Sequence, residues 1–173
     1  YEASKEDQAR RFASIYRGLG YDCKVEVLHR FCFLPLAHDI QEIQRAVIER
    51  NIQLVVVDSA GPACGGEPES AENALRFFDA LRTLKVTSLC IAHSTKAESY
   101  GMPFGSVFFF NASRNIWEIF KDQDEGGTGL HVMLKHRKSN VGPLNKPVGI
   151  ALKFSDGHVS MRLGDVDKTS AVF

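Results

Sequence analysis

The sequence predicts an α/β fold in which a mostly parallel sheet, flanked by helices, finishes in antiparallel strands. Two observations support this prediction. Short β-branched apolar runs alternate with stretches of helical periodicity through roughly the first two-thirds of the chain, which is typical of parallel strands joined by crossover helices. From about residue 115 onward, strand-like runs follow one another with only short loops between them, which indicates antiparallel pairing.

The composition is that of an ordinary globular domain. The 173 residues are 44% hydrophobic and 24% charged, and this length suits one domain with its own core. The 21 basic and 21 acidic side chains cancel, so net charge argues neither for nor against a nucleic-acid partner. The sequence shows no signal peptide and no apolar run of about 18 residues. We therefore expect a cytoplasmic protein with no membrane partner.

The four cysteines do not form a metal-binding pattern. Cys23, Cys32, Cys64 and Cys90 include no C-x-x-C pair, and a zinc site normally needs such close pairs or neighbouring histidines. We expect buried or half-buried thiols in a reducing compartment.

The first third of the chain predicts two helices and a strand. Ser4 can cap a helix over residues 5–17, and Gly18 and Gly20 follow it as stop signals. Residues 24–33 alternate between apolar and polar side chains, which predicts a strand.

The second helix is predicted from a cap at Asp39 through Arg50. Four apolar side chains at helical spacing are expected to face inward: Ile40, Ile43, Val47 and Ile48.

The centre of the chain predicts two strands that are buried on both faces. Residues 52–58 and 86–92 are continuous apolar runs, as expected of parallel strands covered by helices on both sides. A Gly- and Pro-rich loop over residues 61–68 and a helix over residues 70–84 separate them. These two strands should be adjacent and parallel.

The last part of the chain predicts an antiparallel meander. A turn-rich loop over residues 95–105 leads into an apolar segment at residues 107–111. Asp156-Gly157 is a hairpin turn signal. Four strands are expected, over residues 115–120, 130–135, 148–154 and 158–163.

Two polar side chains follow the central strands at the predicted ligand-binding edge of the sheet. Asp58 ends the first strand, and open α/β sheets bind ligands at the carboxyl ends of their strands. In ATPases such a carboxylate holds Mg²⁺ through water, whereas the alternative is an aspartate that caps the next turn. His93, followed by Ser94, ends the second strand at the same edge. It can sense a γ-phosphate, or it can be structural.

A pair of cations lies later in the chain. Lys135 and Arg137 flank one residue on an extended segment, so both side chains should point to the same face. Two cations before the Gly142-Pro143 turn suit a polyphosphate, and the alternative is a solvated basic strand end. Glu2 indicates nothing by itself.

Together these motifs resemble the RecA-like ATPases, in particular the branch of hexameric replicative helicases and RepA-type helicases. The resemblance implies a three-layer RecA-like core over residues 1–163 and a polar tail over residues 164–173. Asp58 matches the Walker B aspartate that holds Mg²⁺, with Ser59 beside it in the nucleotide site. Glu2 matches the glutamate that polarises the attacking water.

The resemblance also implies a shared site for ATP and Mg²⁺. His93 matches the γ-phosphate sensor of the family. Lys135 and Arg137 match a pair that reaches the nucleotide of a neighbouring subunit, so the expected partners are further subunits in a ring or filament. If these cations act on a neighbour, they should be exposed and lack a carboxylate partner of their own.

One departure from the family pattern is large. No G-x-x-x-x-G-K-[ST] phosphate-binding loop (P-loop) occurs in the sequence. We therefore expect a fragment of a longer ATPase that lacks the first strand, the P-loop and the first helix, and that is inactive alone.

Three functions remain open. The first is an ATP-dependent motor or switch that acts on nucleic acid, and the second is a non-catalytic assembly or regulatory domain of the same fold. The third is an unrelated α/β enzyme with no role for the later cations. For single-stranded DNA the support is weak, because the loop over residues 59–70 has Glu67 and Glu69 but no Lys or Arg. Lys96 and Tyr100 offer a cation and a stacking surface.

Overall fold

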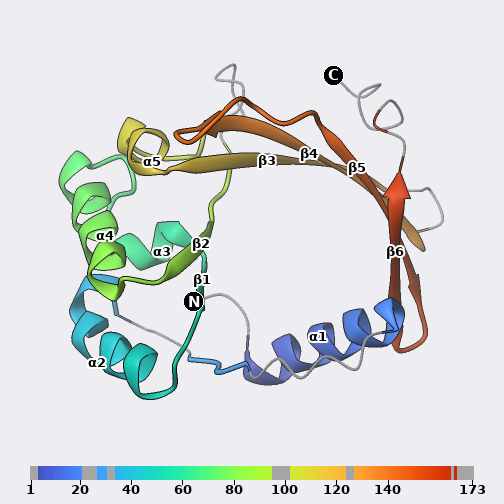
Figure 1. Ribbon diagram of the computed structural model, residues 1–173, viewed down its shortest axis with the longest axis horizontal. Coiled ribbons are helices and arrows are strands. Elements are labelled where there is room, and N and C mark those ends of the chain that lie inside the picture. Colours follow the sequence, from blue (N-terminus) through green and yellow to red (C-terminus); the bar gives the residue numbers. More distant parts are fainter. Residues whose placement is uncertain are drawn as a thin grey trace. The chain divides into compact units, whose positions relative to one another are not determined.

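The structure is a computed structural model that describes residues 4–20, 27–30, 34–94, 102–123, 127–164 and 166. The chain divides into two compact units. One unit consists of Tyr1–Ala3 and Arg30–Ser113, and the other of Ser4–His29 and Arg114–Phe173. Figure 1 shows the helices and short parallel strands of the first unit and the long antiparallel strands of the second. No helix among the described residues is long and apolar enough to cross a membrane.

The parallel sheet of the first unit has two strands. β1 (Leu54–Asp58) and β2 (Thr87–Ile91) pair in parallel, and Asp58 lies opposite Ile91 in the register. The crossover between them contains α4 (Ala71–Leu84). Ser70 caps this helix by accepting a hydrogen bond from the backbone amide of Asn73. The predicted pair of adjacent parallel strands is confirmed.

Helix α2 (Leu36–Glu49) begins three residues before the predicted cap. Its N-cap is Pro35, and Asp39 lies in the first helical turn, where a carboxylate interacts favourably with the helix dipole. Ile48 is 72% exposed, so its predicted inward orientation is wrong. It lies one residue beyond the buried Val47, about 100° further around the helix.

A short helix, α3 (Ala60–Cys64), occupies the first half of the predicted Gly- and Pro-rich loop. Pro62 is tolerated because the first amides of a helix have no intrahelical acceptor. Gly65, at φ 75°, ends the helix in the left-handed conformation. The apolar segment after residue 105 also forms a helix, α5 (Val107–Ala112), which is capped by Ser106.

The core of the first unit lies on one side of the parallel strands. Three aromatic rings at its centre (Phe77, Phe78 and Phe109) pack with centroids 5.4 to 5.9 Å apart. Val57 is buried and Val55 packs against the same cluster. The prediction that these strands are covered on both faces is wrong, because the alternate apolar side chains are about half exposed: Leu54, Val56, Leu89 and Ile91.

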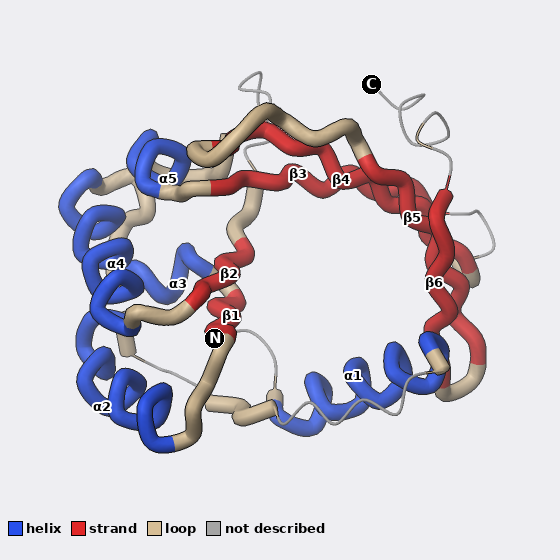
Figure 2. Tube along the Cα trace, viewed as in Figure 1, coloured by secondary structure: helices blue, strands red, loops and turns tan. Residues whose placement is uncertain are grey.

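The second unit contains a four-stranded antiparallel sheet in the order β3-β4-β5-β6 (Figure 2). The strands are β3 (Asn115–Gln123), β4 (Gly129–Ser139), β5 (Val148–Ser155) and β6 (His158–Gly164). The meander confirms the predicted strands and the hairpin turn at Asp156-Gly157, where Gly157 has φ 74°. In the described residues the sheet is hydrogen-bonded separately from β1 and β2, rather than continuing the same sheet.

Helix α1 (Lys5–Leu19) packs against β6 in the second unit. The hydroxyl of Ser4 accepts from the backbone amide of Asp7, and Gly20 adopts the left-handed C-cap conformation, as the sequence predicts. A Cβ atom at Gly18 would lie 1.8 Å from the carbonyl oxygen of Val159, so only glycine permits this close approach.

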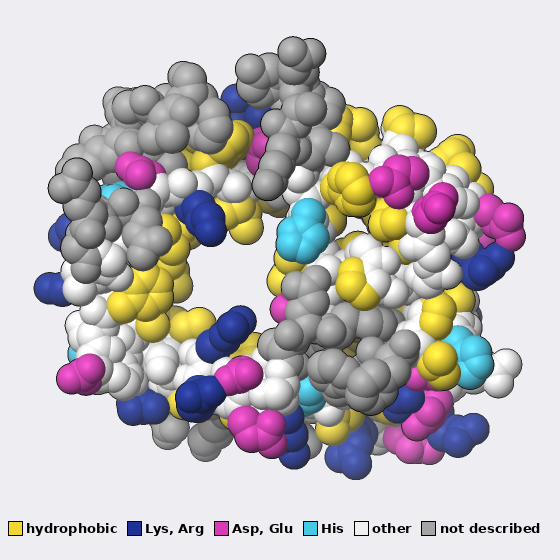
Figure 3. Space-filling view, turned by 180° about the vertical axis from the view of Figure 1, so that it is seen from behind, with side chains coloured by type: hydrophobic (Ala, Val, Ile, Leu, Met, Phe, Trp, Pro, Cys, Tyr) yellow, Lys and Arg dark blue, Asp and Glu magenta, His cyan; other side chains and the backbone are white. Residues whose placement is uncertain are grey.

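Some predicted segments lie wholly or partly outside the described residues. In the strand predicted over residues 24–33, residues 27–30 are described and are not in a strand. In the tail predicted over residues 164–173, only residues 164 and 166 are described. Basic and acidic side chains are interspersed on the face shown in Figure 3, as the zero net charge leads one to expect.

Candidate functional site

The carboxyl edge of the parallel strands brings the two predicted strand-end residues together. Asp58 is the last residue of β1 and is half-buried. Its register partner, Ile91, is the last residue of β2, and the exposed His93 follows two residues later. Asp58 and His93 therefore lie at the same edge of the sheet, on adjacent parallel strands.

Ser59, the residue that follows Asp58, is buried. Its side chain is only 1% exposed, and its carbonyl oxygen accepts a hydrogen bond from the amide of Ala63 at 3.3 Å in the first turn of α3. The peptide bond between Asp58 and Ser59 is cis. Of these two neighbours, Asp58 offers more side-chain surface to a ligand.

Two backbone contacts organise the segments that leave this edge. The amide of Phe104 donates a hydrogen bond to the carbonyl oxygen of His93 at 2.7 Å, next to an isolated bridge between Ser94 and Pro103. The amide of Ser106 donates to the carbonyl oxygen of a residue on the other segment, Pro68, at 2.8 Å. The segment that follows β2 is thus fastened to the segment that follows β1.

Three predicted site residues lie outside the described part of the chain: Glu2, Lys96 and Tyr100.

The predicted cation pair lies on β4 in the second unit. Lys135 lies opposite Glu118 of β3, whereas Arg137 occupies a β-bulge, because the register moves from Ile116–Lys138 to Trp117–His136. Nε and Nη2 of Arg137 both lie 2.5 Å from Oε2 of Glu118.

This ion pair is mostly buried. The side chains of Arg137 and Glu118 are 20% and 15% exposed, and the guanidinium lies 5.9 Å from the ring centre of Phe120. The expectation that Arg137 is exposed and lacks a carboxylate partner is therefore wrong. Its partner comes from the neighbouring strand, at a position that only the strand register reveals.

Comparison with known proteins identifies the chain. A sequence model of a family described as an AAA domain matches residues 1–99, which is more than half of the sequence. The chain belongs to this AAA domain family.

The fold of this AAA domain is similar to that of a solved structure, a KaiC-like protein from the hyperthermophilic archaeon Pyrococcus horikoshii OT3. The TM-score is 0.59 at 16% sequence identity, and the match covers 93% of this chain and 73% of the other. A search of curated proteins gave no match. The family and the fold together show a RecA-like ATPase core, as the sequence predicts.

Asp58 is a residue at this edge that could hold a Mg²⁺ ion together with the phosphates of a nucleotide. Mg²⁺ prefers oxygen ligands and often binds through one or two carboxylates together with phosphate oxygens. Asp58 supplies one such carboxylate at the strand end. No cluster of three or more His, Cys, Asp or Glu side chains that could form an all-protein metal site occurs among the described residues.

An aromatic pair beside the basic strand end was missed by sequence reasoning. The rings of Trp117 and His136 stack with centroids 4.3 Å apart and an interplanar angle of 1°. His136 is 5% exposed, and its Nδ1 accepts a hydrogen bond from the backbone amide of Asn145 at 2.9 Å. The pair anchors the segment after β4 next to Arg137. Only the strand register brings Trp117 and His136 together.

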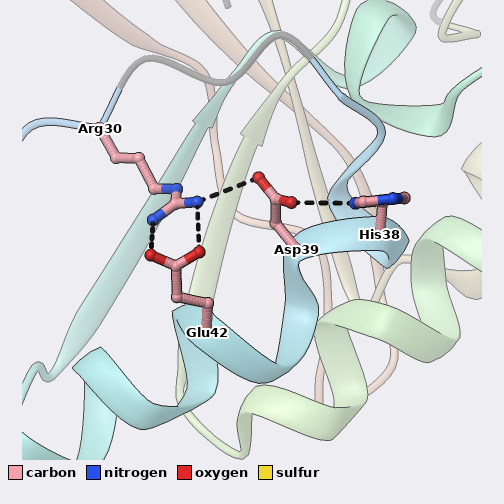
Figure 4. Close-up of polar contacts among 4 residues, drawn as sticks. All are labelled: Arg30, His38, Asp39 and Glu42. Carbon is pink, nitrogen blue, oxygen red and sulfur yellow. Dashed lines mark hydrogen bonds and ion pairs between the residues drawn. The ribbon is translucent and has the colours of Figure 1, made fainter.

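A second missed cluster lies at the start of α2 (Figure 4). Arg30 binds both carboxylate oxygens of Glu42, at 2.8 and 2.9 Å, and one oxygen of Asp39 at 3.0 Å. Hydrogen bonds from His38 and then Arg30 hold the pKa of Asp39 below its ordinary value of 3.8. The Arg30 hydrogen bond likewise lowers the pKa of Glu42. The cluster fastens the segment before α2 to that helix.

The described cysteines agree with the predicted buried or half-buried thiols. Cys64 is buried and Cys90 is half-buried, and both are unpaired. Burial raises the pKa of both thiols, that of Cys90 to about 11. Such thiols are almost entirely protonated near neutral pH and hence weakly nucleophilic. Cys23 and Cys32 lie outside the described residues.

Proposed function

We propose that this AAA domain forms part of an ATP-hydrolysing motor or switch in which the nucleotide is shared between neighbouring subunits. The observation that carries the proposal is the parallel pairing of β1 with β2, which brings Asp58 and His93 to one edge of the sheet. Ligands bind at this edge in open α/β folds.

Asp58 and His93 have different roles in this proposal. The Asp58 carboxylate holds Mg²⁺ through water, and bound Mg²⁺ neutralises charge on the phosphates. His93 contacts the γ-phosphate, and Glu2 polarises the attacking water. The backbone amide of Phe104 is hydrogen-bonded to the carbonyl oxygen of His93, and the amide of Ser106 is hydrogen-bonded to the carbonyl oxygen of Pro68. In this proposal these two bonds transmit a displacement of His93 to the segment that follows β2 and to the segment that follows β1.

The neighbouring subunit contributes Lys135 and Arg137, and because Arg137 is mostly buried against Glu118, it does so as a guanidinium already held by a carboxylate rather than as the free, exposed cation that the sequence predicts. Arginine suits this role because its planar guanidinium stays charged and can bind two phosphate oxygens. Glu118 interacts with Nε and Nη2 of Arg137, so in this proposal Nη1 is the nitrogen that binds the phosphate. The ion pair orients the guanidinium on the sheet face before a nucleotide arrives.

The motor or switch acts on single-stranded nucleic acid in this proposal, with Lys96 and Tyr100 as contacts from the segment after β2. Their residue types support it, since a cation can bind the strand's phosphates and an aromatic ring can stack on its bases. The absence of Lys and Arg from residues 59–70 favours a contact on this second segment rather than on the first.

A second candidate function is a non-catalytic assembly or regulatory domain. It is favoured by one observation, the absence of a G-x-x-x-x-G-K-[ST] loop from these 173 residues. Without that loop the phosphates have no backbone cradle and no lysine. Under this alternative the edge at Asp58 and His93 takes part in assembly alone.

Hydrolysis measurements separate the two candidates. In a parent protein with a phosphate-binding loop ahead of Tyr1, Asp58→Asn should lower steady-state phosphate release by about a thousandfold, since metal-dependent charge stabilisation dominates phosphoryl transfer. Asp79→Asn, on the exposed side of α4, is the matched control and should leave the rate unchanged. Equal rates for the two variants would favour the non-catalytic domain.

A further inference from the structure

A hollow of mixed polar and apolar lining, which includes His131, Leu152 and Met161, lies across β4, β5 and β6 of the antiparallel sheet. Its volume is about 380 Å³. Residues that line it include Thr128, Gly129, Ala151, Lys153, Ser160 and Arg162. We propose that this hollow binds the phosphate backbone of single-stranded nucleic acid, an inference that rests on the proposed function for its choice of partner.

The strand register explains why the surface is hollowed here. Gly129, Lys153 and Ser160 lie opposite one another in one row, and Ala151 lies opposite Arg162 in the next. Residues directly opposite each other share a face of the sheet. The small side chains of Gly129, Ala151 and Ser160 leave space between the two long cationic ones.

The two cations of the hollow have no carboxylate across the ladder. Lys153 faces Gly129 and Ser160, and Arg162 faces Ala151. Both cations are exposed. They are diagonal neighbours, about 7–8 Å apart along the sheet, so their charges repel each other. An anion between them would relieve this repulsion.

The hollow suits a phosphate group. Guanidinium and ammonium groups both bind phosphate oxygens through charge-assisted hydrogen bonds. The hydroxyls of Thr128 and Ser160 line the same space and can donate to the remaining oxygens.

The same face carries one further cation beyond the hollow, Lys135, which lies opposite Glu118 and which the proposed function assigns to the nucleotide of a neighbouring subunit. Lys135 lies six residues along β4 from Gly129, on the same face of the sheet. At about 3.4 Å per residue, the two positions are about 20 Å apart. Of the acidic groups on this face, Glu118 is bound to Arg137 and Asp122 lies on the far strand opposite His131. Grooves that bind single strands use cations to follow the backbone, and Lys153 and Arg162 are the two that the hollow supplies.

The test is fluorescence anisotropy of a labelled oligothymidylate of about 12 nucleotides with the full 173-residue chain. The double variant Lys153→Ala/Arg162→Ala should weaken binding by about tenfold or more. It should also reduce the slope of log K against log salt concentration by about 1.4, at about 0.7 for each lost contact with a single strand. Lys153→Arg/Arg162→Lys should restore both values.

The matched control also removes two positive charges from the second unit, but at positions outside the hollow. Lys121 lies on the opposite face of the sheet and Lys146 lies in the segment after β4, and both are exposed. Lys121→Ala/Lys146→Ala should bind within about twofold of the wild type. Circular dichroism melting of every variant verifies that loss of binding is not loss of folding.

Three results would overturn the proposal. The first is no binding by the wild type at about 50 mM salt, and the second is equal weakening by the test and control variants. The third is complete displacement of the oligonucleotide by tripolyphosphate at equal phosphate concentration, which would show a site for small anions. None of these results bears on hydrolysis at Asp58, which is measured separately.

Discussion

The carbonyl oxygen of Pro68 accepts a hydrogen bond from the backbone amide of Ser106 at 2.8 Å. These residues belong to the segments that follow β1 and β2, so the bond joins the two segments that leave the edge at Asp58 and His93. Gly105 makes the approach feasible, because its φ is 117° and a Cβ atom there would lie 2.8 Å from the Pro68 oxygen.

Gly105→Ala should therefore destabilise the protein by about 1–3 kcal/mol, the cost of holding a side chain in a disfavoured backbone conformation. Gly61→Ala is the matched control, because nothing lies within 4 Å of its added Cβ and alanine favours a helix. It should be neutral or slightly stabilising. Urea denaturation measures both, and equal effects would show that the contact at Pro68 is unimportant.

Phe77 is the most deeply buried large side chain of the first unit, at 1% exposed, and its ring packs against Phe78 and Phe109. Phe77→Ala should lower the free energy of unfolding by about 3–5 kcal/mol through lost burial and the cavity it leaves. Leu75→Ala, on the exposed side of the same helix at 40% exposed, should cost far less. If Phe77→Ala and Leu75→Ala lowered the free energy of unfolding equally, the core would not be centred on Phe77.

The mostly buried ion pair of Glu118 and Arg137 predicts coupling between the two positions. Glu118→Ala leaves a guanidinium without its partner and should cost about 1–3 kcal/mol of stability. Arg137→Ala should have a similar effect. The double variant should be more stable than the sum of the two single effects predicts, because each change removes the same interaction. Additive effects in urea denaturation would show that the pair contributes no coupling energy.

The Arg30 cluster predicts a pH-dependent contribution to stability. The folded-state pKa values of Asp39 and Glu42 are lowered from 3.8 and 4.5. The stabilisation by their ionised forms is therefore present above these ordinary values and is lost as pH falls through the lowered ones. Arg30→Gln should lower the melting temperature at pH 7, and the difference from wild type should shrink as pH falls through the lowered pKa values of the two carboxyls.

The control for this effect is Arg50→Gln, at the end of the same helix and outside the cluster. It should show little dependence on pH. A melting-temperature difference for Arg30→Gln that stays constant between neutral and acidic pH would contradict the role of the carboxylates.

Local patterns predicted the parts of the fold that depend on neighbours in the sequence. The apolar runs that end at Asp58 and before His93 predicted two adjacent parallel strands, and Ser4 predicted the start of the first helix. Pro62 was misleading, because it was interpreted as a loop residue although it is also compatible with the first turn of a helix.

Features that depend on contacts between distant segments could not be predicted. The ion pair of Arg137 with Glu118 requires the register of β3 and β4, including a bulge that the sequence does not signal. The stack of Trp117 on His136 has the same cause. The exposure of Val56 was missed because an apolar β-branched run looks the same whether helices cover one face or both.

The shared nucleotide site is tested most directly by mixing two inactive variants of a parent protein that carries a phosphate-binding loop. Asp58→Asn and Arg137→Ala should each abolish hydrolysis alone, because every interface then lacks one group. In an equal mixture, about a quarter of the interfaces should combine an intact Asp58 with an intact Arg137 from the neighbouring subunit and recover activity. A mixture that forms mixed assemblies and yet stays inactive would contradict a site shared between subunits.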